Sequence, residues 1–199
     1  IATYIAGKAI ALTLLETGQS LDMCTINKIE SRIKNREENS SIDLHSQFGN
    51  VFKRSAKENS SLISTLEAEN SIKSLLSGRA AHRLLFNSLG YGIHKQDDIQ
   101  AQELIIKWML SAIADPSEKQ TKSYNAYNNY IDEMVKLLTP YKQAIEIVAN
   151  ILCQEGSLDG KIVSWIVTKV KERKTPFSQE EVKQFVNTYM HTFIAESQN

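Results

Sequence analysis

Apolar residues recur at helical spacing at the start of the chain. In residues 1–17 they fall at every third or fourth position, at Ile1, Ile5, Ala9, Leu12 and Leu15. Residues three or four apart share one face of a helix, so this pattern predicts a helix here, with Gly18 as its stop. The same spacing predicts a long helix over residues 61–87.

The next helix is expected where two acidic residues precede a further apolar stripe. Asp97 or Asp98 can cap it, because an Asp side chain accepts hydrogen bonds from the free N–H groups of a first turn. Asp115 and Pro116 are expected to end it. The sequence that follows is polar, and we expect residues 115–129 to form a loop.

Apolar periodicity returns after this polar stretch. It predicts two more helices, at about residues 130–153 and 159–172. Pro140 is expected to kink or interrupt the first of them, because proline lacks a backbone N–H and clashes with the preceding turn.

A small β structure is predicted between the first two helices. Residues 23–26 form a short apolar run that fits a strand, and residues 42–48 are its expected partner. Residues 31–60 are otherwise expected to be a polar loop. The predicted fold class is therefore mainly α, with at most a small β-hairpin.

The C-terminal residues 173–199 carry a helix signature of their own. Ser178 and Glu181 have the spacing of a capping box. An apolar stripe follows, made of Val182, Phe185, Val186, Tyr189 and Phe193. This pattern predicts an amphipathic helix that packs on the same core or on a neighbouring subunit.

The chain is long enough for a compact domain and carries no net charge. It has 199 residues, with 23 basic and 23 acidic side chains. This balance provides no field to attract nucleic acid, so no nucleic-acid partner is expected. Cys24 and Cys153 suit a reducing compartment, although a single long-range disulfide stays open. No apolar run approaches the roughly 20 residues of a membrane span.

One short motif has the spacing of a zinc-peptidase helix. In such a helix, His-Glu-x-x-His holds zinc with two histidines one turn apart, and the Glu takes a proton from the zinc-bound water. Here Tyr4 and Lys8 stand at the two histidine positions and Ile5 at that of the base. Ala6-Gly7 between them is typical of one zinc-peptidase family.

Two later blocks follow in the order expected for that family. The first is Gly78-Arg79-Ala80-Ala81-His82 with the later Asp98-Ile99, and the second is Gly156-Ser157-Leu158-Asp159-Gly160. With the first motif they resemble the peptidase domain of FtsH-type membrane-bound AAA+ proteases, over roughly residues 1–172. The resemblance implies a helical FtsH peptidase-like domain there, in which Asp98 matches the family's third zinc ligand.

The departures from the family's pattern remove its chemistry. Without two histidines and a base there is no activated water, so we expect a pseudopeptidase with no catalytic residue, metal or cofactor. The resemblance then implies a ring of like or mixed subunits, a hexamer in the family, that binds protein clients. It also implies a fragment of a longer AAA+ protein, at the cytoplasmic face of a membrane through an anchor that precedes Ile1.

Asp98 needs another cation if zinc is absent, since a buried unpaired carboxylate is costly. We predict that Lys8 and Asp98 form an ion pair in the place of the metal, with the Tyr4 hydroxyl nearby. The alternative is that Lys8 extends its ammonium group into solvent.

A rebuilt metal site is the other possibility for this region, with His82, His94 and Asp98 as ligands. Such a site would accord with a different function, a divergent ATP-dependent zinc metallopeptidase that still cleaves proteins with zinc as its cofactor. A third function is a free-standing helical adaptor whose similarity to the family is accidental.

Overall fold

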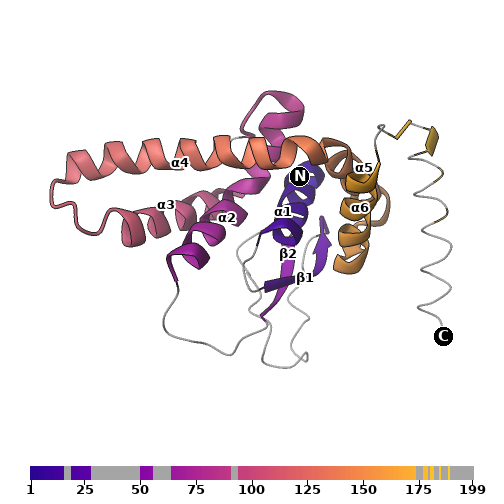
Figure 1. The fold of residues 1–199 in the computed structure, drawn as a ribbon, viewed down its shortest axis with the longest axis horizontal. Helices are drawn as coiled ribbons and strands as arrows, with labels where there is room; N and C mark the ends of the chain where they lie inside the picture. The colour runs from indigo at the N-terminus through magenta and orange to yellow at the C-terminus, as the bar shows by residue number, and fades with distance from the viewer. Residues whose placement is uncertain are drawn as a thin grey trace.

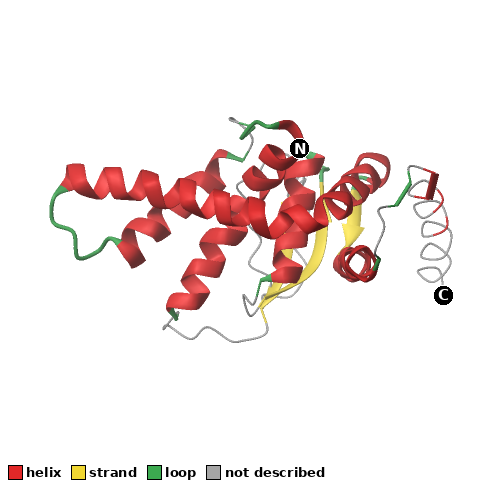
Figure 2. Ribbon diagram, turned by 45° about the horizontal axis from the view of Figure 1, so that its top comes forward, coloured by secondary structure: helices red, strands yellow, loops and turns green. Residues whose placement is uncertain are grey.

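The computed structural model describes residues 1–15, 19–27, 50–55, 64–90 and 94–173, and a few positions between 177 and 188. Helices dominate these residues, with one small sheet beside them (Figures 1 and 2). The prediction of a mainly α fold is confirmed. No described helix is long and apolar enough to cross a membrane.

Helix α1 (Ala2–Leu14) lies at the centre of the fold, and its middle is buried on every side. It packs most closely on α2 (Thr65–Phe86), and two glycines permit the approach. A Cβ atom on Gly7 would lie 2.3 Å from the Cβ of Ala81, and one on Gly78 would lie 2.6 Å from the Tyr4 ring. Small residues at this crossing therefore bring the two helices together and seat the Tyr4 ring on the α2 backbone.

The sheet has three antiparallel strands in the order β2-β1-β3. Strand β1 (Gln19–Thr25) pairs with β2 (Asn50–Ser55) on one side and with β3 (Ser157–Asp159) on the other. The expected partner of β1, residues 42–48, lies outside the described residues. The prediction of a loop throughout 31–60 is wrong at β2, and β3 extends the sheet beyond a hairpin.

Helices α3 (Lys95–Met109) and α4 (Pro116–Leu138) form an arm that extends from the body (Figure 1). The prediction of a loop over 115–129 is wrong, because α4 begins at Pro116. Asp115 ends no helix but caps this one, accepting hydrogen bonds from the backbone N–H groups of Ser117 and Glu118. Proline at the first helical position loses no hydrogen bond and presets φ.

The chain turns after α4 as Pro140 predicts. The short 3-10 helix η1 (Thr139–Tyr141) contains this proline, and α5 (Lys142–Glu155) follows it. Helix α6 (Gly160–Glu172) begins at an Asp159 cap that accepts from Lys161 N–H. Both helices bury apolar residues against α1 in the main core.

The C-terminal segment is described only at its start. Ser178 and Glu181 exchange the two hydrogen bonds of a capping box, which confirms that prediction. Just before it, the Gln143 side chain on α5 bonds both the N–H and the carbonyl of Phe177. The stripe residues lie outside the described residues. Cys24 is buried in β1 and Cys153 is exposed on α5, and no disulfide joins them.

Candidate functional site

A buried cluster of charged and polar side chains lies where α1, α2 and α3 meet. Tyr4 and Lys8 stand one turn apart on α1, and both donate to the same oxygen, Oδ2 of Asp97 in the first turn of α3. The Tyr4 hydroxyl is 2.8 Å from that oxygen and the Lys8 Nζ is 2.7 Å from it. Their exposed fractions are 0% for Tyr4, 5% for Lys8 and 3% for Asp97. Two positions of α1 and one of α3 therefore converge on one point inside the protein.

The partner of Lys8 is Asp97, and the predicted pairing with Asp98 is corrected by one residue. Consecutive helix residues point about 100° apart, so only one of the two carboxylates can face α1. The alternative, that Lys8 reaches solvent, is also wrong, because its ammonium group is buried in the ion pair. The Tyr4 hydroxyl lies beside the ammonium group of Lys8 as predicted, since both donate to one carboxylate oxygen.

Asp98 belongs to a second, adjoining ion pair with Arg79 of α2. Two of the three guanidinium nitrogens, Nε at 3.0 Å and Nη2, donate to this carboxylate. The Tyr127 hydroxyl of α4 also donates to it, at 2.8 Å. Arg79 Nη1 also donates to the carbonyls of Leu89 and Gly90. One buried arginine thus ties α2 to α3 and to the loop that precedes α3.

His94 closes the cluster on the side of that loop. Its ring stacks on the Tyr4 ring, with centroids 4.5 Å apart and planes 12° apart. Its backbone has a φ of 50°, a left-handed conformation that is uncommon outside glycine. Burial, followed by the charge of Lys8, lowers the pKa of His94 to about 4. The imidazole is therefore neutral at pH 7, and its buried Nε2 makes no hydrogen bond within the described structure.

Tyr4 is held as a neutral hydrogen-bond donor. Burial, and then the negative charge of Asp97, raises the pKa of its phenol well above the usual value. The ring lies between Gly78 and His94, with the Arg79 guanidinium 5.7 Å from its centroid. Packing on all sides fixes the hydroxyl on Asp97.

The three candidate ligands of a rebuilt metal site are each engaged by other groups. His82 Nδ1 lies 2.8 Å from the carbonyl of Ser88, His94 stacks on Tyr4, and Asp98 is engaged by Arg79. Across the described ranges, no three His, Cys, Asp or Glu side chains gather as a metal site. The positions of a zinc-peptidase motif do not fit zinc either, because Lys8 places a cation on the Asp97 carboxylate and Tyr4 presents a neutral hydroxyl that already donates to it.

The Arg79–Asp98–Tyr127 group was missed by sequence reasoning, although a signal for it exists. Arg79 falls on the buried face that the apolar positions of residues 61–87 define, beside Leu75, Leu76 and Ala80. An arginine on such a face needs a carboxylate partner. Its position in the sequence could thus have predicted a buried ion pair, though not which aspartate completes it.

No family model matches the chain, and a search of curated proteins found no significant match.

Proposed function

We propose that this chain is a catalytically inactive peptidase-like domain of the FtsH type, which serves subunit assembly and the binding of protein clients. The observation that carries the proposal is the convergence of Tyr4, Lys8 and Asp97 on one point. The motif spacing assigns Tyr4 and Lys8 to the two positions of zinc-binding histidines, and Asp97 adjoins the residue that matches the third ligand. Two of the three ligand positions thus converge on one carboxylate, that of the residue before the third position, and their side chains carry a different chemistry.

The chemistry of the cluster favours a structural role over a catalytic one. The Lys8 ammonium supplies the positive charge that the Asp97 carboxylate requires in a buried setting. Ile5, at the position of a general base, is fully buried and cannot take up a proton. With the cation built into the chain, the cluster joins α1 to α3 and leaves no water-activating group at these positions.

The proposal is tested first by the metal content of the natural chain. We expect far less than one zinc per chain after purification without chelator and addition of zinc, and no cleavage of an unfolded protein substrate. About one tightly bound zinc per chain with measurable cleavage would instead support the divergent zinc metallopeptidase.

A restoring variant tests the geometry itself. In Tyr4→His/Ile5→Glu/Lys8→His, two imidazoles and the Asp97 carboxylate would meet at one point, so we expect it to bind about one zinc per chain. The matched control is Lys161→His/Trp165→His, which places histidines one turn apart on exposed positions of α6, away from the cluster. Equal zinc binding by both variants would remove the argument from convergence.

A further inference from the structure

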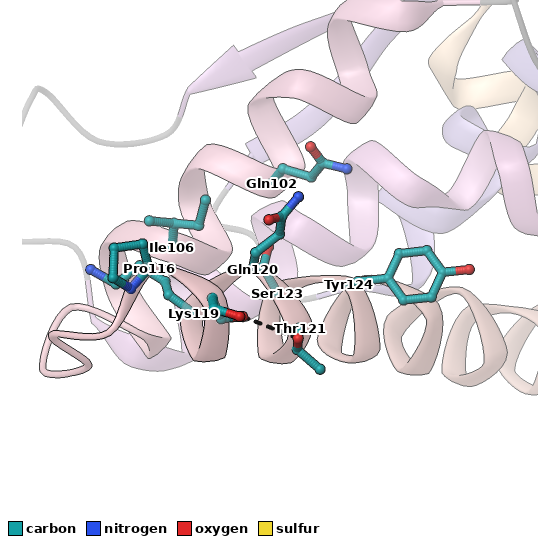
Figure 3. Close-up of a pocket in the computed structure, with 9 residues that line it drawn as sticks. Gln102, Ile106, Pro116, Lys119, Gln120, Thr121, Ser123 and Tyr124 are labelled. Carbon is teal, nitrogen blue, oxygen red and sulfur yellow. Dashed lines mark hydrogen bonds between the residues drawn. The ribbon is translucent and has the colours of Figure 1, made fainter.

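The arm formed by α3 and α4 carries a groove that the buried cluster does not use. The cavity has a volume of about 630 Å³ and runs between the two helices. In Figure 3, Gln120 points from α4 toward Gln102 on α3, while Ile106 and Pro116 supply apolar surface at one end. Lys119 is the single charged side chain among the described residues that line it.

Exposed apolar side chains lie on both helices of the arm, and two of them, Ile106 and Tyr124, line this groove. Ile99, Ile106 and Met109 lie on one face of α3 with Gln102, at helical spacing, and are 38%, 40% and 45% exposed. Tyr124, on the α4 side, is 67% exposed. Two helices that border a groove with apolar positions offer a seat for the apolar face of a third helix.

We propose that this groove receives the C-terminal helix of a second copy of this chain. The sequence of residues 178–193 supplies a matching element, because its stripe of Val182, Phe185, Val186, Tyr189 and Phe193 needs an apolar seat. Its capping box is formed in the structure, which marks where that helix begins. The exposed Glu180 in its first turn has the charge opposite to that of Lys119.

The geometry of the fold favours a groove on another molecule. Gln143 holds Phe177 at the start of α5, on the side of the molecule opposite the arm (Figures 1 and 2). Tyr124 lies 14 residues, about 21 Å, before the end of α4, whereas nine residues of the helix predicted from the sequence, from Phe177 to Val186, would span about 14 Å. A helix anchored at Phe177 is too short to lay the middle of its stripe in its own groove.

Such a contact joins two different surfaces and is therefore heterologous. Repeated head to tail it closes into a ring or grows into a filament, depending on the rotation between copies. The inference specifies how the proposed assembly role is built, and rests on that role only for the expectation that the subunits associate.

Sedimentation velocity of the full chain tests the inference with three variants. We expect the natural chain to associate below about 100 µM, and Ile106→Asp in the groove and Phe185→Asp in the stripe each to raise the dissociation constant at least tenfold. Leu66→Asp is the matched control, since Leu66 is exposed on α2 outside the groove and its change should leave association unaltered. Far-ultraviolet circular dichroism checks that each variant is folded.

A mixture of the two interface variants gives the decisive result. The intact stripe of Ile106→Asp fits the intact groove of Phe185→Asp, so we expect the mixture to form 1:1 dimers that grow no further, although each variant alone is monomeric. A natural chain that stays monomeric at about 100 µM, or a mixture that forms no dimer, overturns the inference. A natural chain that stays monomeric also removes the proposed role in subunit assembly, whereas a mixture that forms no dimer while the natural chain associates overturns the inference alone. Neither outcome bears on zinc content or cleavage.

Discussion

At the scale of single residues, the Lys8–Asp97 ion pair is the feature whose disruption should lower the free energy of unfolding most. A buried pair contributes little net stability compared with apolar residues, but loss of one partner leaves the other charged and unpaired. We therefore expect Lys8→Met to lower the free energy of unfolding by about 3–5 kcal/mol in urea denaturation. Tyr4 would still donate to Asp97, but one neutral donor does not balance a buried carboxylate.

The double variant Lys8→Met/Asp97→Asn separates loss of charge from loss of packing. It removes both charges and keeps a similar volume, so most of the lost stability should return. As a control, Lys122→Met breaks the exposed pair with Glu118 one turn away on α4 and should cost less than about 0.5 kcal/mol. A loss below about 1 kcal/mol for Lys8→Met would contradict a buried ion pair.

At the scale of helices, the close crossing of α1 and α2 reverses an ordinary expectation. In a helix interior, replacing glycine by alanine usually adds about 1 kcal/mol of stability. At Gly7 the new methyl would lie 2.3 Å from the Cβ of Ala81 and 3.0 Å from the carbonyl of Ser77, so backbone must move. We expect Gly7→Ala to destabilise the protein by about 1–3 kcal/mol, as measured by thermal or urea denaturation.

The control for this crossing is a change that helix propensity alone governs. Asn125→Ala replaces an exposed residue in the interior of α4 and should add a few tenths of a kcal/mol. If Gly7→Ala also stabilised the protein, the two helices would be farther apart than the structure places them.

The helices show where sequence reasoning succeeds and where it fails. The helices α1 and α2 and the interruption at Pro140 follow from apolar spacing and proline chemistry. Residues 116–129 were read as a loop because Ser, Asn, Lys and Gln dominate them. They form a helix because the Asp115 cap starts it and Tyr127, Tyr130 and Ile131 bury its inner face. A few aromatic anchors outweigh a polar composition once another helix covers them.

At the scale of the whole molecule, the cluster was predictable in kind but not in detail. The resemblance to the peptidase family led to Asp98 as the partner of Lys8, whereas the structure pairs Lys8 with Asp97, the residue before it. Which aspartate it meets depends on the rotation of α3 about its axis, and packing against α1, α2 and α4 sets that rotation. The local sequence does not predict this rotation, because Asp97 and Asp98 are equally suited to the first turn of a helix.

The pH dependence of stability is a property of the whole molecule that His94 should dominate at mildly acidic pH. In the folded state burial, with the charges of Lys8 and Arg79, opposes protonation, while Asp97 favours it, and the pKa falls from 6.5 to about 4. The unfolded chain therefore takes up a proton as the pH falls through about 6.5, while the folded chain does not. The contribution of His94 to the free energy of unfolding is therefore fully present above about pH 6.5. It declines as the pH falls to about 4 and does not change further below that pH.

We expect this loss to reach about 1–2 kcal/mol, since one pH unit between the two pKa values corresponds to about 1.4 kcal/mol and water reaches part of the ring. The measurement is urea denaturation at several pH values between 4 and 7, for the natural chain and for His94→Asn, because Asn tolerates the left-handed backbone found here. As the pH falls from 7 to 4, the natural chain should lose unfolding free energy relative to the variant. Parallel profiles for the two proteins would show that His94 titrates alike in the folded and unfolded chain, and would count against its burial on Tyr4 beside a charged Lys8.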